Sequence, residues 1–510
     1  MKKFITFLKN LLIFIIVLFS FILIFTIDWL YKTFGNLTLE EIVFQLNVPF
    51  TGSNTDYYYD YAQKALPLII ICTVISFIII CMFFKRKKIK GVHFTENTSL
   101  IVYKKFRIDT KFLGKLAVSI LVLIGSIIYA NNKTDFTGYL EKQYSNSPLI
   151  EEEYINAANT EIEFPENKRN LIYIYLESME ATYYSKENDG AYDESIIPEL
   201  EQLAANNISF SKSNELAGLY VLPGTAWTVG AMTAQTTGLP LKIPIEGNSY
   251  GQYNSFMPGA YSIGQILQKQ GYRQMLMIGS DARFAGRDSL FKQHGGYEIF
   301  DVYSAVEEEK IKEENFVWWG FPDRNLFEYA KEKIITLASG EQPFNFTMLT
   351  VDTHPIGGYF CEDCEEKYDD QYLNVLACSS KKVNEFIEWI QMQDFYENTT
   401  IIVCGDHLSM QPQTFEQIDN SGYKRTAFNV IINSPIETEN TKNRYASTID
   451  MFPTTLASLG AKIKGERLGL GTNLFSKTKT IIERLGLDYV DEELCKNSKF
   501  YNEEFLYEKK

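Results

Sequence analysis

Residues 170–177 read Asn-Leu-Ile-Tyr-Ile-Tyr-Leu-Glu, in which an unbroken apolar run at 171–176 is followed by a carboxylate. Short apolar runs of the same type recur at 273–278, 346–351, 400–404 and 427–432. Amphipathic stretches separate them, and those at 262–271 and 379–393 have helical periodicity. Such runs indicate buried parallel strands joined by crossover helices. We therefore predict an α/β domain whose sheet is covered by helices on both faces.

Charged and metal-competent side chains follow several of these runs. Glu177 follows the first run, His354 follows 346–351, and Asp406 and His407 follow 400–404. Arg283 and Arg287 come shortly after 273–278. In sheets of this type, ligands bind beyond the carboxyl ends of the strands. The pattern predicts a site at that edge.

The composition divides the chain into two parts. The chain has 510 residues, and 45% of them are apolar, which excludes disorder as its main state. Residues 1–135 carry 16 Lys and Arg against 8 Asp and Glu, whereas residues 136–510 carry 33 against 56. The formal net charge of −15 argues against a nucleic-acid partner.

The basic part contains three apolar runs, which predict membrane helices at about 11–29, 65–84 and 112–130 within an anchor of residues 1–135. Each is long enough to cross about 30 Å of hydrocarbon. Buried core helices are the alternative, but three such runs with charged flanks disfavour it. Lys and Arg crowd the N-terminus and residues 85–111. Both segments are therefore expected to be cytoplasmic, with everything after about residue 131 outside a bacterial cell membrane.

Residues 136–167 are polar and irregular, and we interpret them as a linker. The catalytic domain is then expected at 168–480 and a C-terminal tail at 481–510. An external domain can hold disulfides, and Cys364 and Cys378 are candidate partners, with Cys361 as a competitor. The sequence does not settle that pairing.

Glu177, Asp406 and His407 offer two carboxylates and an imidazole. With a hydroxyl added, this mostly oxygen set suits Mn²⁺ or Mg²⁺, and Zn²⁺ is an alternative. Such an ion polarises a phosphoryl oxygen and lowers the pKa of a bound hydroxyl. The chain has only 4 histidines, which argues for one metal ion rather than two.

The candidate hydroxyl belongs to Thr225, in the stretch Leu-Pro-Gly-Thr-Ala-Trp-Thr-Val-Gly at 222–230. Pro-Gly marks a tight turn, and Thr225 follows the turn and precedes an expected helix that runs through Thr236. A hydroxyl at a helix N-terminus meets free N–H groups that favour a phosphate or an alkoxide. The alternative is that Thr225 only caps the helix.

Arg283, Arg287 and His354 are candidate substrate-binding residues. Guanidinium groups bind phosphate bidentately, so the two arginines fit an anionic substrate. The alternative is a solvated, salt-bridged surface. His354 can donate to a substrate oxygen or act as an acid or base, although a lone histidine is more often structural.

Together these motifs resemble the alkaline phosphatase/sulfatase superfamily. More closely, they resemble its membrane-anchored phosphoglycerol transferases, namely the glucan phosphoglycerol transferase and lipoteichoic acid synthase. The resemblance covers roughly residues 165–480 and is tighter to the glucan enzyme. It rests on the strand ending in Glu177, the turn at 222–225 with the helix after it, and the Gly-Asp-His stretch at 405–407. The stretches at 245–249, 283–288, 318–323, 349–355, 379–387 and 448–455 are also similar.

The resemblance implies an α/β/α sandwich and a phosphotransferase of the EC 2.7.8 type. Thr225 would be the nucleophile, with Glu177, Thr225, Asp406 and His407 as ligands of one metal ion, Mn²⁺ above all. The donor would be phosphatidylglycerol, diacylglycerol would leave, and a phosphothreonine intermediate would pass glycerophosphate to a glycan or glycerol-phosphate polymer. His354, Arg283 and Arg287 would contact substrate. Lipoteichoic acid synthase differs by a tryptophan near Ala285, so its acceptor is not carried over.

Other activities of this superfamily compete with that interpretation. Phosphoethanolamine transfer and a phosphodiesterase or phospholipase C-like reaction, with water as acceptor, are the main alternatives. Sulfatase activity is disfavoured because a threonine cannot become formylglycine. A non-catalytic membrane sensor is disfavoured by the complete set of candidate ligands.

Overall fold

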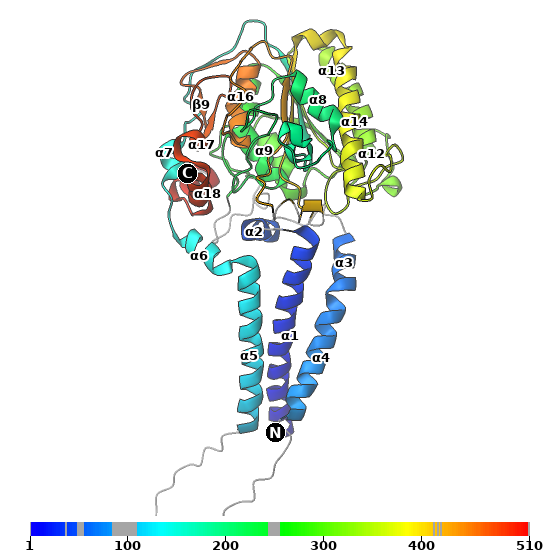
Figure 1. The fold of residues 1–510 in the computed structure, drawn as a ribbon, viewed down its shortest axis with the longest axis vertical. Coiled ribbons are helices and arrows are strands. Elements are labelled where there is room, and N and C mark those ends of the chain that lie inside the picture. Colours follow the sequence, from blue (N-terminus) through cyan, green and yellow to red (C-terminus); the bar gives the residue numbers. More distant parts are fainter. Residues whose placement is uncertain are drawn as a thin grey trace, which may run out of the picture. The chain divides into compact units, whose positions relative to one another are not determined.

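The computed structural model describes residues 2–35, 38–47, 56–83, 110–242, 255–411, 414–415, 418 and 421–507 (Figure 1). The basic loop that predicts the orientation, His93 within it and the stretch at 245–249 lie outside these residues. The chain forms two compact units, Met1–Thr33 with Thr55–Gly138, and Phe34–Asn54 with Tyr139–Lys510. Each unit is described by itself.

The first unit is built from apolar helices. Three helical segments, Lys3–Phe34, Asp56–Phe83 and Thr110–Thr134, are long and apolar enough to cross a membrane. They contain α1 (Lys2–Phe34), α3 (Asp56–Lys64), α4 (Leu66–Phe83) and α5 (Thr110–Thr134), and α6 (Phe136–Tyr144) follows. Large apolar side chains such as Phe19, Ile71 and Leu121 are exposed on them. A soluble core would bury these side chains, so the helices indicate a membrane anchor.

The second unit is organised around a six-stranded sheet in the order β4-β3-β5-β2-β6-β7. The strands are β2 (Asn170–Leu176), β3 (Arg273–Ile278), β4 (Glu298–Phe300), β5 (Phe344–Leu349), β6 (Thr399–Gly405) and β7 (Asn429–Ile432). All neighbours pair in parallel except β6 and β7, which are antiparallel. The predicted α/β class is confirmed, but the prediction that 427–432 is parallel is wrong. An apolar run buried on both faces carries no signal of strand direction.

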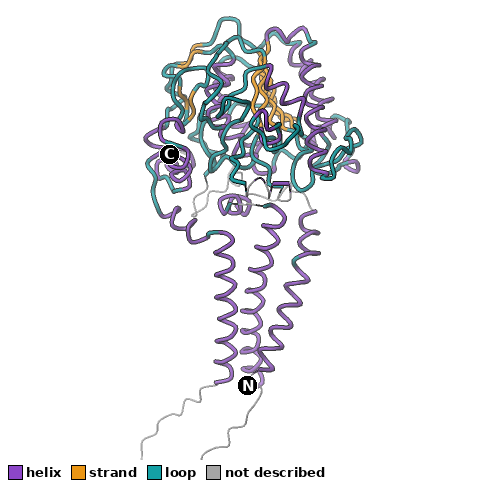
Figure 2. Tube along the Cα trace, viewed as in Figure 1, coloured by secondary structure: helices purple, strands orange, loops and turns teal. Residues whose placement is uncertain are grey.

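The central strand β2 divides the core into two layers. Leu171, Tyr173 and Tyr175 pack into one apolar cluster, and the alternating side chains of Ile172 and Ile174 pack into the other. This is the period of two that a strand imposes on its side chains. Each such side chain contributes about 1.5–3 kcal/mol when it is fully buried. Figure 2 shows the strands enclosed between helices.

Helices cover both faces of this sheet. The first cluster contains side chains of α9 (Thr228–Thr237), α10 (Ile263–Lys269), α11 (Arg287–Gln293) and α16 (Met451–Ser458). The second contains side chains of α8 (Pro198–Asn206), α12 (Val302–Glu307), α13 (Asp323–Ala338) and α14 (Gln371–Gln391). Figure 1 shows α13 and α14 side by side on one flank of the domain.

Residues 145–167 and 481–507, which the sequence analysis assigns to a linker and a C-terminal tail, contain helices and a strand in the second unit. They form α7 (Leu149–Glu153), β1 (Ile162–Glu163), α17 (Ile481–Leu485), α18 (Leu487–Cys495) and α19 (Lys499–Tyr501). Strand β1 pairs with β8 (Lys462–Ile463), and β9 (Arg467–Leu468) pairs with β10 (Gly471–Thr472). Leu149, Tyr501 and Phe505 are buried in the first cluster. Charged residues separate these apolar residues in the sequence, so the polar composition of the segments gives no indication that they pack into a core.

Candidate metal and phosphoryl-transfer site

Glu177, Asp406 and His407 meet at the carboxyl ends of two neighbouring strands. Leu176 of β2 pairs with Gly405 of β6, so the residue that follows each strand reaches the same edge. One ligand atom from each of the three side chains lies within 4.8 Å of the others. All three side chains are buried. The structure therefore brings the predicted ligand set together.

Polar neighbours fix the orientation of Glu177. Its backbone N–H donates to Thr350 Oγ1 at 3.0 Å, and Thr353 Oγ1 donates to its carbonyl oxygen at 2.5 Å. Ser178 lies at φ 55°, an uncommon conformation for a residue with a side chain. There its hydroxyl donates to Glu177 Oε1 at 2.7 Å and its N–H donates to Asp406 Oδ1 at 2.8 Å. Backbone strain is thus held at the point where the two carboxylates meet.

The cluster fits a divalent cation. Asp406 Oδ2 is buried and accepts no hydrogen bond from any described residue. His407 Nδ1 donates to the Leu408 carbonyl at 2.9 Å, and its Nε2 faces Glu177 Oε1 at 3.5 Å and Asp406 Oδ2 at 3.4 Å. Burial opposes a charged imidazole, but Asp406 and Glu177 outweigh it and raise the pKa of His407 to about 8. Two buried carboxylates with an orphaned oxygen thus provide the negative charge that a metal ion neutralises.

Of the two threonine hydroxyls at 225 and 228, that of Thr228 lies beside this cluster. Thr228 Oγ1 lies 3.4 Å from Glu177 Oε2 and 3.5 Å from His407 Nε2. Thr225 is fully buried, and its hydroxyl donates to the Leu222 carbonyl at 2.9 Å and accepts from the Leu222 N–H at 3.0 Å. The structure therefore does not place Thr225 as the fourth ligand. Its hydroxyl closes the turn, as in the capping alternative.

The turn before α9 explains this difference. Gly224 has φ 79°, and a Cβ there would lie 2.8 Å from Pro240 Cβ, so the position requires glycine. The chain needs three more residues to complete the turn, and α9 begins at Thr228. No side-chain hydrogen bond caps its N-terminus, where Trp227 is the N-cap residue. The Pro-Gly turn predicts a helix that starts directly after Thr225, which is too early, and therefore favours the Thr225 hydroxyl as the candidate ligand and nucleophile.

His354 and Arg287 lie within electrostatic reach of Glu177. Burial lowers the pKa of His354 despite the charge of Glu177, and its Nδ1 donates to the Pro355 carbonyl at 2.6 Å. Burial also lowers the pKa of Arg287, to about 10, so this guanidinium stays charged at neutral pH. Its Nε and Nη2 groups donate to Phe284 O, Ser280 Oγ and Asp281 O. Nη1 donates to no described group, so it is available to an anionic substrate.

Trp319 stands beside His354, and sequence reasoning missed it. The two rings have centroids 4.8 Å apart, and the Trp319 ring also lies 5.4 Å from Phe284. Phe284 in turn lies under the guanidinium of Arg287. The aromatic pair thus supports both predicted substrate-binding residues. The Trp-Trp pair at 318–319 was the available signal.

Arg283 has different surroundings. It forms a bidentate ion pair with Asp281, with distances of 2.7–3.2 Å, and lies over the ring of Tyr303. Its side chain is 55% exposed and lines a surface pocket with Asp288, Lys292 and Tyr303. This arrangement matches the salt-bridged alternative. A direct role for Arg283 in substrate binding remains a prediction.

One further charged residue acts on the cluster, and a disulfide forms elsewhere in the same unit. The short helix α2 (Leu39–Asn47) of the second unit carries Glu41, whose charge acts on His407. Glu41 Oε2 accepts from the Thr38 N–H at 2.7 Å, and Thr38 Oγ1 accepts from the Glu41 N–H at 3.2 Å, which is a capping box. Cys364 and Cys378 form a disulfide, and Cys361 is a free, buried cysteine.

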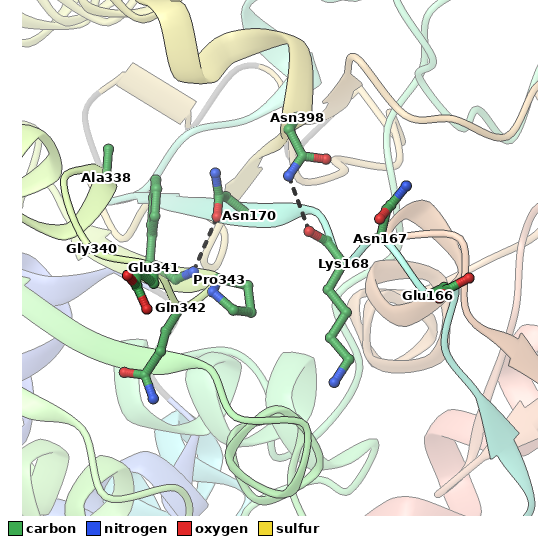
Figure 3. A pocket seen from close by; sticks show the side chains of 11 residues that line it. Glu166, Asn167, Lys168, Asn170, Ala338, Gly340, Glu341, Gln342, Pro343 and Asn398 are labelled. Atoms are coloured by element: carbon green, nitrogen blue, oxygen red, sulfur yellow. Dashed lines mark hydrogen bonds between the residues drawn. The ribbon is translucent and has the colours of Figure 1, made fainter.

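A surface pocket lies at the amino-terminal edge of the sheet, opposite the edge that carries Glu177 (Figure 3). It is lined by residues that include Lys168, Asn170, Phe344 and Asn398. Asn170 and Phe344 are the first residues of β2 and β5, and Asn398 Nδ2 donates to the Lys168 carbonyl at 3.0 Å. The length of β2 therefore separates this pocket from Glu177, roughly 20 Å at the usual rise per residue.

Fold and site together define a class: an α/β domain with a buried Glu-Asp-His set and a hydroxyl at a helix N-terminus, at the carboxyl edge of a largely parallel sheet. The Sulfatase family model matches residues 169–461. The chain therefore belongs to this family, and the resemblance seen in the sequence is confirmed.

Relatives within the family carry a transferase name. Phosphoglycerol transferase I of Salmonella choleraesuis (strain SC-B67) is 30% identical over 385 residues, which is 74% of this chain and 48% of that protein. Phosphoglycerol transferase I of Escherichia coli (strain SMS-3-5 / SECEC) is 29% identical over the same shares. The chain thus spans about half the length of these curated relatives.

A solved structure shares the fold. Integral membrane lipooligosaccharide phosphoethanolamine transferase A from Neisseria meningitidis aligns with a TM-score of 0.50 at 12% identity. The alignment covers 89% of this chain and 84% of that one.

Proposed function

We propose that the protein transfers glycerophosphoryl groups from phosphatidylglycerol to an extracytoplasmic glycan or glycerol-phosphate polymer. The observation that carries the proposal is the position of the Thr228 hydroxyl, at the N-terminus of α9 and beside Glu177 and His407. The names of the curated relatives support the glycerophosphoryl group. Three apolar helices support a donor that resides in the membrane.

Thr228 is the nucleophile in this proposal. Its oxygen attacks the phosphorus of phosphatidylglycerol, a bond forms to Oγ1 and the hydroxyl proton is lost; the bond from phosphorus to the diacylglycerol oxygen breaks, and that oxygen takes up a proton as diacylglycerol leaves. An acceptor hydroxyl then attacks the same phosphorus, and the glycerophosphoryl-Thr228 bond breaks. The free N–H groups in the first turn of α9 stabilise the phosphoryl oxygens in both steps.

Glu177, Asp406 and His407 would hold one divalent ion, which polarises a phosphoryl oxygen and lowers the pKa of a nearby hydroxyl. Mn²⁺ or Mg²⁺ fits the mostly oxygen ligand set, and Zn²⁺ is the alternative. Arg287 binds the phosphoryl group through its remaining N–H donors. His354 keeps its Nδ1 proton on Pro355, so its Nε2 lone pair accepts a hydrogen bond, or the proton, of a substrate hydroxyl.

The proposed arrangement in the cell places the N-terminus in the cytoplasm and the second unit outside. The charge distribution of the chain supports this orientation, because Lys and Arg concentrate before the first span and between the second and third spans. In this orientation the catalytic unit faces the acceptor of the cell envelope.

The test is to incubate the purified full-length protein in detergent with a cell-envelope extract and head-group-labelled phosphatidylglycerol, or, in a parallel assay, head-group-labelled phosphatidylethanolamine. We expect diacylglycerol release and label on a glycan or polymer. Release of free glycerol phosphate alone would favour the phospholipase C-like alternative, in which water is the acceptor. Labelling that occurs only with phosphatidylethanolamine would favour phosphoethanolamine transfer.

A further inference from the structure

Three cysteines outside the proposed site form a compact cluster. Cys378 of α14 is joined to Cys364 by the disulfide, and the Cα atoms of the pair are 5.2 Å apart. The free thiol of Cys361 lies 3.5 Å, sulfur to sulfur, from Cys364. A third sulfur this close to a disulfide is the arrangement from which thiol–disulfide exchange starts.

A buried cation accompanies the free thiol. Lys382 Nζ donates to Cys361 Sγ at 2.8 Å, and its side chain is only 11% exposed. Burial by itself would lower the pKa of Lys382, but its contact with Cys361 and the charge of Asp352 outweigh this and raise that pKa. The ammonium therefore stays charged. The ammonium is thus in direct contact with the sulfur atom that faces the disulfide.

We propose that Cys361, Cys364 and Cys378 form an intramolecular thiol–disulfide exchange site. Cys361 loses its proton, its sulfur bonds to Cys364 Sγ, and the bond between Cys364 and Cys378 breaks. Cys378 leaves as a thiolate and takes up a proton from solvent. One disulfide and one thiol are present before and after, so the step needs no oxidant or reductant.

The two pairings tie the chain differently. The disulfide between Cys364 and Cys378 fastens the segment after His354 to α14. A disulfide between Cys361 and Cys364 closes only a short local loop and releases that segment from the helix. The same Lys382 lies 3.8 Å from Asp352, and the Asp352 and Asp323 carboxylates accept N–H bonds across the start of α13 and the end of β5. The exchange site is thus connected to the segment that carries His354.

The test uses the wild-type full-length protein without reductant or oxidant. The protein is incubated with N-ethylmaleimide at pH 8, quenched in acid and digested after Lys367 and Glu362, which separates all three cysteines for mass spectrometry. We expect a fraction of molecules that carry the label on Cys378 and a disulfide between Cys361 and Cys364. Label on Cys361 alone would overturn the proposal.

Two variants make the test specific. Lys382→Met should slow the labelling of Cys378 by about tenfold, because the attacking sulfur loses the cation that contacts it. Lys381→Met, which removes the neighbouring surface lysine, should not. Equal rates for both variants would overturn the proposal.

A second variant tests the same chemistry should Lys382→Met fail to fold. Cys378→Ser in oxidised glutathione should form the bond between Cys361 and Cys364. Two separately modified thiols in this variant would contradict the proposal. So would a stoichiometric zinc ion that protects all three thiols after reduction, because the cluster would then be a metal site.

Discussion

The hydroxyl oxygen of Thr228 lies 3.4 Å from the carboxylate oxygen Oε2 of Glu177. One group opens a helix and the other ends the central strand of the sheet, so the fold itself sets their separation. Thr228 is partly exposed whereas Glu177 is buried, so a substrate can reach the hydroxyl from outside while the carboxylate stays protected. This relationship links the proposed nucleophile to the proposed metal centre.

Substitutions of the carboxylates and of the Thr228 hydroxyl should distinguish a loss of metal binding from a loss of catalysis. Glu177→Gln and Asp406→Asn remove charge from the ligand set, so we expect them to lose bound Mn²⁺ and activity together. Thr228→Val keeps both carboxylates and should bind the metal within about tenfold of wild type while losing activity. Metal content after dialysis, measured by elemental mass spectrometry, checks this. Full metal content in Asp406→Asn would refute the assigned ligands.

Substitutions of Arg287 and Arg283 should lower kcat/KM to very different extents. Arg287 is buried and acts on Glu177, so Arg287→Lys should lower kcat/KM by about tenfold to a hundredfold because a lysine cannot donate in the same planar geometry. Arg283→Lys is the matched control, since Arg283 is committed to Asp281 at the surface. The kcat/KM of Arg283→Lys should stay within about threefold of the wild-type value. Equal losses of kcat/KM in both variants would indicate that Arg283 also binds the substrate.

Trp319 should affect substrate binding through His354. Trp319→Ala removes the ring that packs at a tilt against His354, so we expect a higher KM and a lower kcat, by about tenfold in their ratio. Trp389→Ala is a suitable control, because Trp389 stacks on Phe386 of α14 in the other apolar cluster. The measurement is steady-state kinetics of both variants, with their metal content checked to equal that of wild type. An unaltered KM for Trp319→Ala would exclude a role in binding.

Glu153 should stabilise the domain in a pH-dependent way. Its carboxylate pairs with Arg484 at 2.6 Å and Arg467 at 2.7 Å, and the hydrogen bond from Arg484 is the main cause of its lowered pKa. Glu153→Gln should cost about 2 kcal/mol at pH 7. The stabilisation is present above the unfolded pKa of about 4.3 and is lost as pH falls through the lower folded pKa. The gap in melting temperature between wild type and variant should therefore narrow below about pH 4.

The exposed Glu151 of the same helix provides the control for this measurement. Glu151→Gln should leave the melting temperature unchanged at every pH. A gap for Glu153→Gln that stays constant from pH 7 to pH 3 would contradict the ion-pair explanation.

The sequence predicted the sheet and most of the site because both depend on local patterns. An apolar run such as 171–176 can only be a buried element, and the charged residue after it must lie at the sheet edge. The direction of β7 depends on long-range pairing and was not predictable from its apolar run. The choice between Thr225 and Thr228 depends on where a turn ends and a helix begins. The turn before that boundary packs against residues that follow α9 in the chain: Leu241 N–H donates to the Gly224 carbonyl at 2.8 Å, and a Cβ on Gly224 would meet Pro240.

The burial of α7 and the C-terminal helices was missed for a similar reason. Their apolar residues, among them Leu149 and Tyr501, are few and separated by charges, so no periodic pattern marks a core face. Only their packing against one another reveals them.

The most direct measurement is the mass of the intact protein after mixing with phosphatidylglycerol in the absence of acceptor. The account predicts that wild type and Thr225→Val gain one glycerophosphoryl group, located on Thr228 by peptide mapping, and release diacylglycerol. Thr228→Val should show no adduct and at least about a thousandfold slower release. Diacylglycerol release by Thr228→Val at the wild-type rate, or an adduct that maps to Thr225, would contradict the account.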